Sequence, residues 1–183
     1  MGHSRSTEPS AWVSRFMHSV RPGAEVLDLA CGSGRHTALF SDAGFKVTAV
    51  DRDIGQLGPL ADAQGVVAVE FDLEGEAGWP FPGRTFGALV VTNYLHRPLF
   101  PAIVSALKPG GVLIYETFAE GNEAYGKPSN PDFLLRPGEL LAAVDGALTV
   151  VAYEHGILEN PRPAVVQRLC AVNGAVPLSL RPH

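Results

Sequence analysis

The sequence contains few cysteines and no long apolar run, and each scarcity excludes a class of protein. The 183 residues include two cysteines, Cys31 and Cys170, which are too few for a disulfide framework. We therefore expect a cytoplasmic protein, because the cytoplasm keeps thiols reduced. No apolar stretch approaches the roughly 18–20 residues that a helix needs to span a bilayer, so we predict no membrane partner. Residues 1–8 are polar and are expected to be flexible, without the apolar core of a signal peptide.

Metal-binding motifs and an excess of positive charge are also missing. The sequence has no CxxC or HExxH motif and its six histidines are scattered, so we predict no metal site. The chain has 14 Lys and Arg residues against 19 Asp and Glu residues, which gives a net charge of −5. Because unaided binding of nucleic acid needs a basic face, a nucleic-acid partner is not favoured.

Short apolar runs alternate with segments of helical periodicity, without repeats or long linkers. Strands are predicted at 24–30, 45–51, 65–72, 86–93 and 111–118, and helices at 9–20, 34–43, 53–63, 98–107 and 137–144. Asp53 is expected to cap the third helix, and the proline-rich link 73–85 is expected to be a loop. The runs 147–158 and 164–172 are separated by a short turn and predict an antiparallel hairpin.

This alternation predicts an α/β fold in one domain of residues 1–183. We expect a doubly wound, Rossmann-like sheet of seven strands, mostly parallel, with a C-terminal antiparallel hairpin and helices on both faces. Ligands of such sheets bind at the carboxyl ends of the strands. Three predicted strands end there in an acid or in glycines, and these ends hold the candidate site.

The first strand ends in "VLDLACGSG" at 26–34, which carries Asp28, Ala30, Gly32 and Gly34. A turn of small residues lets the backbone approach a ligand closely and places the N–H groups of the next helix beside it. Dinucleotides and S-adenosylmethionine both use such a turn. The third glycine of the dinucleotide motif GxGxxG is Thr37 here, which weakens the dinucleotide interpretation.

Two further acids follow at the ends of the second and third strands. Asp51 stands about twenty residues after the first acid, at the spacing of a residue that binds ribose hydroxyls. Asp72 lies between Phe71 and Leu73, where a carboxylate can accept from the adenine amino group and apolar side chains can hold the ring. For Asp28 two roles stay open: an anchor for the amino group of S-adenosylmethionine, or a buried structural acid.

With these residues in place, the chain resembles the class I S-adenosylmethionine-dependent methyltransferases over residues 24–172. "VLDLACGSG" is similar to their first motif, "VTAVDRD" to their second-strand acid, "VEFDL" to their adenine-site acid, and "ALKPGGVLIYE" to the approach to their fifth strand. The pattern "YETF…GKP…PDFLL…GEL" resembles small bacterial members of the tellurite-resistance type. Ala30 departs from the frequent glycine, and alanine is tolerable at this position if its φ is negative.

The resemblance implies S-adenosylmethionine as the cofactor and an enzyme that transfers its methyl group directly to a small-molecule acceptor. The implied cofactor-binding residues are Asp28, Ala30, Gly32, Gly34, Asp51, Arg52, Asp72, Leu73 and Asn93. Three alternatives stay open: an RNA or protein methyltransferase that works with a partner, a non-catalytic cofactor-binding protein, and a nicotinamide oxidoreductase. The oligomeric state is open.

The methyl group of class I enzymes faces the end of the fourth strand, which reads "VVTNYLHRPLF" here. It lacks the (N/D)PP(Y/F) motif of enzymes that methylate base or amide nitrogens. His96 and Tyr94 are candidate catalytic residues, although His96 could equally cap the following helix or pack structurally. Glu116 is a candidate for binding substrate or for pairing with an arginine.

Residues 119–135 form the longest predicted loop, rich in Gly and Pro. Loops of this length are often functional, and we expect a lid over the acceptor that presents Lys127 and, near its end, Arg136 as substrate-binding residues. The alternative is a mobile surface loop.

Overall fold

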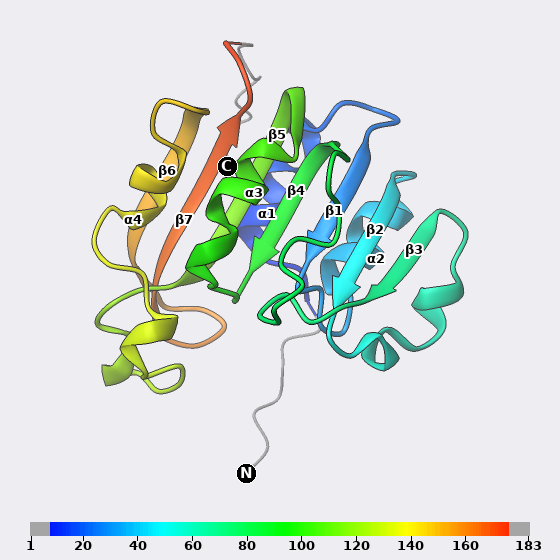
Figure 1. Cartoon of the computed structure of the whole chain (residues 1–183). Helices are drawn as coiled ribbons and strands as arrows, with labels where there is room; N and C mark the ends of the chain where they lie inside the picture. The colour runs from blue at the N-terminus through cyan, green and yellow to red at the C-terminus, as the bar shows by residue number, and fades with distance from the viewer. Residues whose placement is uncertain (1–7, 176–183) are drawn as a thin grey trace.

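Residues 8–175 are described by a computed structural model, in which seven strands form one sheet in the order β3-β2-β1-β4-β5-β7-β6 (Figure 1). The strands are β1 (Glu25–Leu29), β2 (Lys46–Asp51), β3 (Val66–Glu70), β4 (Phe86–Thr92), β5 (Leu107–Phe118), β6 (Thr149–Leu158) and β7 (Ala164–Val172). β7 pairs antiparallel with both β5 and β6, and the other pairs are parallel. The predicted fold class is confirmed.

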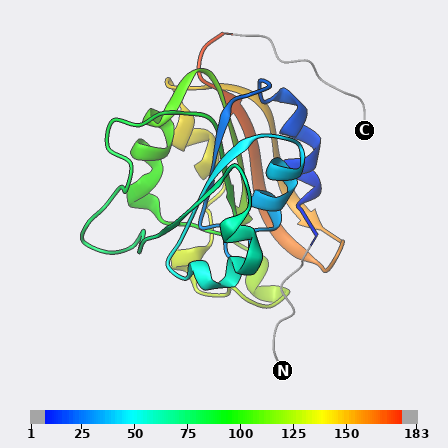
Figure 2. The same ribbon diagram turned by 90° about the vertical axis from the view of Figure 1, so that its right-hand side faces the viewer.

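Helices cover both faces of the sheet (Figures 1 and 2). One face is covered by α1 (Ala11–Phe16), η1 (Met17–Ser19) and α2 (Arg35–Asp42), and the other by α3 (Phe100–Ser105) and α4 (Glu139–Val144). Short 3₁₀ turns are η2 (Ile54–Asp62), η3 (Arg97–Leu99), η4 (Asn122–Ala124) and η5 (Pro131–Phe133). Within residues 8–175, no helix has the length and apolar character that crossing a membrane requires.

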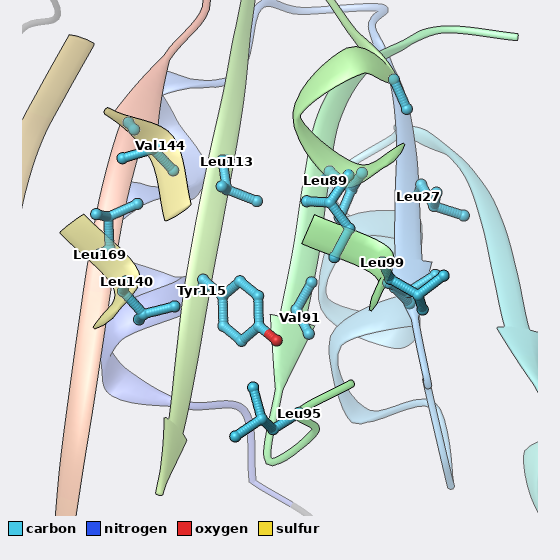
Figure 3. Packing of buried hydrophobic residues seen from close by; sticks show 14 of the residues in the cluster. Leu27, Leu89, Val91, Leu95, Leu99, Leu113, Tyr115, Leu140, Val144 and Leu169 are labelled. Carbon is cyan, nitrogen blue, oxygen red and sulfur yellow. The ribbon is translucent and has the colours of Figure 1, made fainter. Parts of the chain in front are cut away.

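The central strands are apolar on both faces because helices bury both. Successive side chains of a strand point to opposite faces. Val26 of β1 therefore joins the cluster under α1 and α2, while its neighbour Leu27 joins the cluster under α3 and α4. Figure 3 shows the second cluster, where Tyr115 of β5 lies between Leu140 of α4 and Val91 of β4. This packing fixes the strand ends that carry the candidate site.

Two predicted elements differ from the structure. The segment 53–63 is a 3₁₀ turn interrupted at Gly58, because Gly58 has a φ of 54° and Pro59 follows it. Proline lacks the backbone N–H that a regular helix needs. Asp53 occupies the N-cap position, but its side chain does not cap the helix and accepts instead from Gln56 Nε2 at 2.9 Å.

The second difference is the start of β5. The "KPGG" segment was expected to end the preceding helix and lie before the strand, yet β5 begins at Leu107. Leu107 pairs with Phe86 of β4, and an irregularity in the register follows. Gly111 makes this possible, because a Cβ there would lie 2.8 Å from the Lys108 carbonyl oxygen.

Candidate cofactor and acceptor site

The loop after β1 is held against the end of β2. Cys31 N–H donates to the Val50 carbonyl at 3.0 Å, and Gly32 N–H donates to Asp51 Oδ2 at 2.8 Å. Gly34 is the N-cap of α2 with a φ of 77°, and a Cβ there would lie 2.5 Å from Leu57 Cδ2. A Cβ on Gly32 would meet no atom within 4 Å. The backbone at Gly32 is therefore open to a ligand.

Ala30 does not meet the condition of a negative φ, since its φ is 55°. The chain turns out of β1 at this residue, and the turn demands the left-handed conformation. That conformation costs an L-residue roughly 1–2 kcal/mol. Asn93, at the end of β4, has the same conformation with a φ of 54°, which asparagine adopts more readily. Backbone strain of this kind is common at functional sites. Here the two strained residues directly follow the neighbouring parallel strands β1 and β4.

Asp28 is 1% exposed and accepts from Thr37 Oγ1 at 2.6 Å. Burial raises the pKa of its carboxyl to about 6, against the lowering influence of the hydrogen bonds from Thr37. The carboxylate thus fastens β1 to the first turn of α2. This geometry fits a buried structural acid, and the role as an anchor for the amino group of S-adenosylmethionine stays a prediction.

Asp51 is the last residue of β2, and Asp72 lies two residues beyond the end of the neighbouring strand β3, which was predicted to reach residue 72. Asp51 is half-buried, and its two oxygens accept from Gly32 N–H and from Asp53 N–H. The Asp51 carbonyl accepts from Phe71 N–H at 2.9 Å, which brings the end of β3 beside it. Asp72 is exposed and accepts from Glu74 N–H at 3.0 Å. Arg52 is exposed beside Asp51, and Leu73 is buried beside Asp72.

The turn after β4 brings Tyr94 to the same edge. Its hydroxyl is buried without a hydrogen-bond partner among the described residues. Burial, and then the carboxylates of Glu74 and Asp72, raise the pKa of this phenol, so it stays neutral and can donate. Its position is fixed, because Tyr115 Oη donates to the Tyr94 carbonyl at 2.9 Å and Asn93 N–H donates to the Glu116 carbonyl at 2.9 Å.

His96 is half-buried at the N-cap of η3, where its side chain makes no capping hydrogen bond. The alternative role as a helix cap is therefore absent from this structure. The position follows Tyr94 by two residues. Its catalytic role stays a prediction.

Glu116 lies on the α1 face of β5, in a network that the sequence did not predict in full. It is 7% exposed and accepts from Ser10 Oγ at 2.8 Å, and its second oxygen lies 3.5 Å from Arg168 Nη1. Arg168 pairs in turn with Glu154. Of the two roles considered for Glu116, the structure shows the ion pair with an arginine.

His36 completes this network and was missed by sequence reasoning. Ser10 N–H donates to His36 Nε2 at 3.0 Å, and His36 Nδ1 lies 3.2 Å from Thr92 Oγ1. Because Nε2 accepts, the proton of the neutral ring sits on Nδ1 and points to Thr92. Burial, and then Arg35, lower the pKa of His36 to about 3. The N-terminal side of α1 is thereby tied to the ends of β4 and β5.

Arg97 holds the segment 119–135 to the same edge, and its role was also missed. Its guanidinium binds Glu139 through Nε and Nη2, at 2.6 and 3.0 Å, and donates to the carbonyls of Asp132 and Leu134 at 2.7 and 2.9 Å. Ala119 and Leu135 form a parallel bridge at the base of the segment. The bridge thus joins the two ends of the segment, and Arg97 additionally holds η5, which contains Asp132.

Lys127 and Arg136 are exposed on or beside this segment. The backbone of Arg136 is anchored, because its N–H donates to Glu139 Oε2 and its carbonyl accepts from Gln167 Nε2. Tyr125 and Phe133 are 46% and 47% exposed on the same segment. The structure brings the loop glycines, Asp51, Asp72, Asn93 and Tyr94 to one edge. Lys127 is exposed on the segment 119–135 and Arg136 is exposed just after it, and their predicted contact with substrate stays a prediction. Among residues 8–175, no group of side chains could hold a metal ion.

Comparison with known proteins identifies the family. Residues 1–141 match the model of a methyltransferase domain. Malonyl-[acyl-carrier protein] O-methyltransferase of Serratia marcescens is 31% identical over 111 residues, which cover 58% of this chain and 43% of that protein. Putative methyltransferase YqeM of Bacillus subtilis is 26% identical over 129 residues, covering 63% and 50%. The chain spans about half the length of these curated relatives.

Solved structures agree at the level of the fold. TehB from Haemophilus influenzae superimposes with a TM-score of 0.71 at 16% identity, covering 89% of this chain and 61% of that one. The 1,6-didemethyltoxoflavin-N1-methyltransferase of Burkholderia thailandensis gives a TM-score of 0.69 at 21% identity, covering 94% and 80%. The chain belongs to the methyltransferase domain family, and the prediction of a class I S-adenosylmethionine-dependent methyltransferase domain is confirmed.

Proposed function

We propose that this protein transfers the methyl group of S-adenosylmethionine to a small-molecule acceptor bound between the end of β4 and the segment 119–135. The observation that carries the proposal is the open backbone at Gly32, held against the carboxylate of Asp51. A ligand can approach this backbone closely, and a carboxylate that can accept two hydroxyl groups stands beside it.

The residues at this edge fit the cofactor by their chemistry. Each Asp51 oxygen accepts one backbone N–H and keeps a lone pair for a ribose hydroxyl. Asp72, beside the buried Leu73, offers an acceptor for the adenine amino group. The buried hydroxyl of Tyr94, which lies near the carboxylates of Glu74 and Asp72, offers a hydrogen-bond donor.

S-adenosylmethionine supplies a methyl group on a positively charged sulfur, which is already a good electrophile. The protein therefore has to position the acceptor and exclude water. Tyr94 and Asn93 would wall the site, and Arg97 would hold the segment 119–135 beside it. His96 would take a proton from an acceptor that holds one tightly. Lys127 and Arg136 would meet an acceptor with negative charge.

The cofactor assignment is tested by Asp51→Asn, with Asp53→Asn as the matched control. Both changes remove one negative charge, but Asp53 pairs with Gln56 and does not hold the loop. Hydrogen bonds to a charged group contribute about 1.5–3 kcal/mol, so Asp51→Asn should weaken binding of S-adenosylmethionine roughly 10- to 100-fold by calorimetry. Asp53→Asn should bind within about twofold of the unchanged protein. Equal affinities for the two variants would refute the ribose assignment.

The acceptor class is tested by the release of S-adenosylhomocysteine in the presence of small thiols, amines and soft anions, with RNA and cell protein as separate arms. Turnover with a small acceptor is the expected result. Turnover only with RNA or protein would replace the small-molecule assignment. Tight cofactor binding without turnover in any arm would favour a non-catalytic role. Cys31 and Cys170 are buried free thiols, which is compatible with the predicted cytoplasmic setting.

A further inference from the structure

A groove lies at the opposite edge of the sheet from the candidate cofactor site. It has a volume of about 440 Å³ and is lined by the amino ends of β1, β2 and β4 and by the start of β5. In Figure 1 this is the upper edge, whereas the loops that carry Asp51 and Tyr94 lie at the lower edge. Pockets for small ligands commonly measure about 300–1,000 Å³, so the groove has the size of a ligand site.

Close-packed glycine backbone forms the floor of this groove. A Cβ on Gly87 would lie 2.6 Å from Ala24 Cβ, and a Cβ on Gly110 would lie 2.7 Å from Arg21 Nη2. The guanidinium of Arg21 therefore rests directly on the backbone of Gly110. Side chains at these two positions would fill the floor and displace the guanidinium.

The groove is basic in a protein that is acidic overall. Arg21, Lys46 and Lys108 line it, and none of the three makes an ion pair within residues 8–175. Glu25 is the acid of the lining, and its charge is already paired with Arg84, whose guanidinium also donates to Thr48 Oγ1. Within residues 8–175, three cations thus line one groove whose single lining acid is already paired with Arg84, while the whole chain carries a net charge of −5.

We propose that this groove, defined by Arg21, Lys46, Lys108 and the backbone at Gly87 and Gly110, binds a phosphate-bearing small molecule. A guanidinium forms paired hydrogen bonds to phosphate oxygens, and lysine ammonium groups add point charges. A group of linked phosphates carries several negative charges, which complement the three cations that line this groove. The ligand is distinct from the methyl donor, which belongs at the carboxyl edge.

The test is a titration of the full-length protein with sodium tripolyphosphate, followed by ¹H–¹⁵N NMR at low salt. Saturable shifts at the amides of Gly87, Gly110 and their neighbours are expected, with no shift at Gly32. Lys46→Gln should weaken the affinity about tenfold, because it removes one charge-assisted contact. Lys46→Arg, which keeps the charge, should retain it.

Arg162→Gln is the matched control, because Arg162 is exposed in the turn between β6 and β7 at the other edge. It should leave the affinity for tripolyphosphate unchanged. Equal losses in Arg162→Gln and Lys46→Gln would show general attraction to the protein surface and would overturn the proposal, as would the absence of saturable shifts. Citrate binding as tightly as tripolyphosphate would overturn the choice of phosphate, and binding of a single-stranded oligonucleotide alone would overturn the choice of a small molecule.

Discussion

The buried carboxyl of Asp28 should make this protein less stable as the pH rises from about 4 to about 6. Its ordinary pKa is 3.8 and burial raises the pKa to about 6. The folded protein therefore holds this proton more tightly than the unfolded chain does, and the stability falls as the unfolded chain loses its proton first. A shift of about two pH units corresponds to about 3 kcal/mol when both states are ionised.

Asp28→Asn removes this ionisation and keeps a side-chain oxygen that can accept from Thr37 Oγ1. Urea unfolding of both proteins at about pH 4 and about pH 7.5 isolates the effect, because other groups titrate alike in the two proteins. Over this interval the unchanged protein should lose about 2 kcal/mol relative to Asp28→Asn. A difference near zero, or a gain, would refute the burial of an ionisable carboxyl at this position.

Three further results follow from the site geometry. The ¹⁵N shifts of the His36 ring should stay those of a neutral imidazole protonated on Nδ1 between pH 5 and pH 8, because its pKa is lowered to about 3; titration near pH 6.5 would contradict this. Ala30→Gly should stabilise the protein by about 0.5–1 kcal/mol in thermal unfolding, by relieving the left-handed strain. Arg97→Lys should break the paired contact with Glu139 and raise KM for the acceptor several-fold with unchanged cofactor affinity; weaker cofactor binding would contradict the assignment.

Local patterns in the sequence were enough to predict the sheet and the loop after β1. Apolar strands with Asp28 near the end of β1, Asp51 at the end of β2 and Asp72 just after β3 specify parallel strands whose carboxyl ends meet. Gly34 leaves no room for a side chain beside Leu57. The left-handed conformation of Ala30 could not be predicted from the local sequence. The hydrogen bonds from the N–H groups of Cys31 and Gly32 to β2 impose the turn out of β1. The sequence shows that Ala30 is small, but it does not show that its backbone is strained.

Contacts between distant segments account for the residues that were missed. His36 meets Ser10 and Thr92, which are 26 and 56 residues away in the chain. Arg97 meets Glu139, 42 residues further on. The sole local signal was that Ser10 precedes a helix, as an N-cap does. Its second bond, to Glu116, depends on the packing of α1 against β5, which no spacing in the sequence encodes.

Calorimetric titration of the purified protein with S-adenosylmethionine and, separately, with NAD tests the central claim most directly. The open backbone at Gly32 and the carboxylate of Asp51 predict micromolar binding of S-adenosylmethionine with one site per chain, and no binding of NAD. Binding of NAD, or of neither compound, would contradict the assignment of this edge as the methyl-donor site.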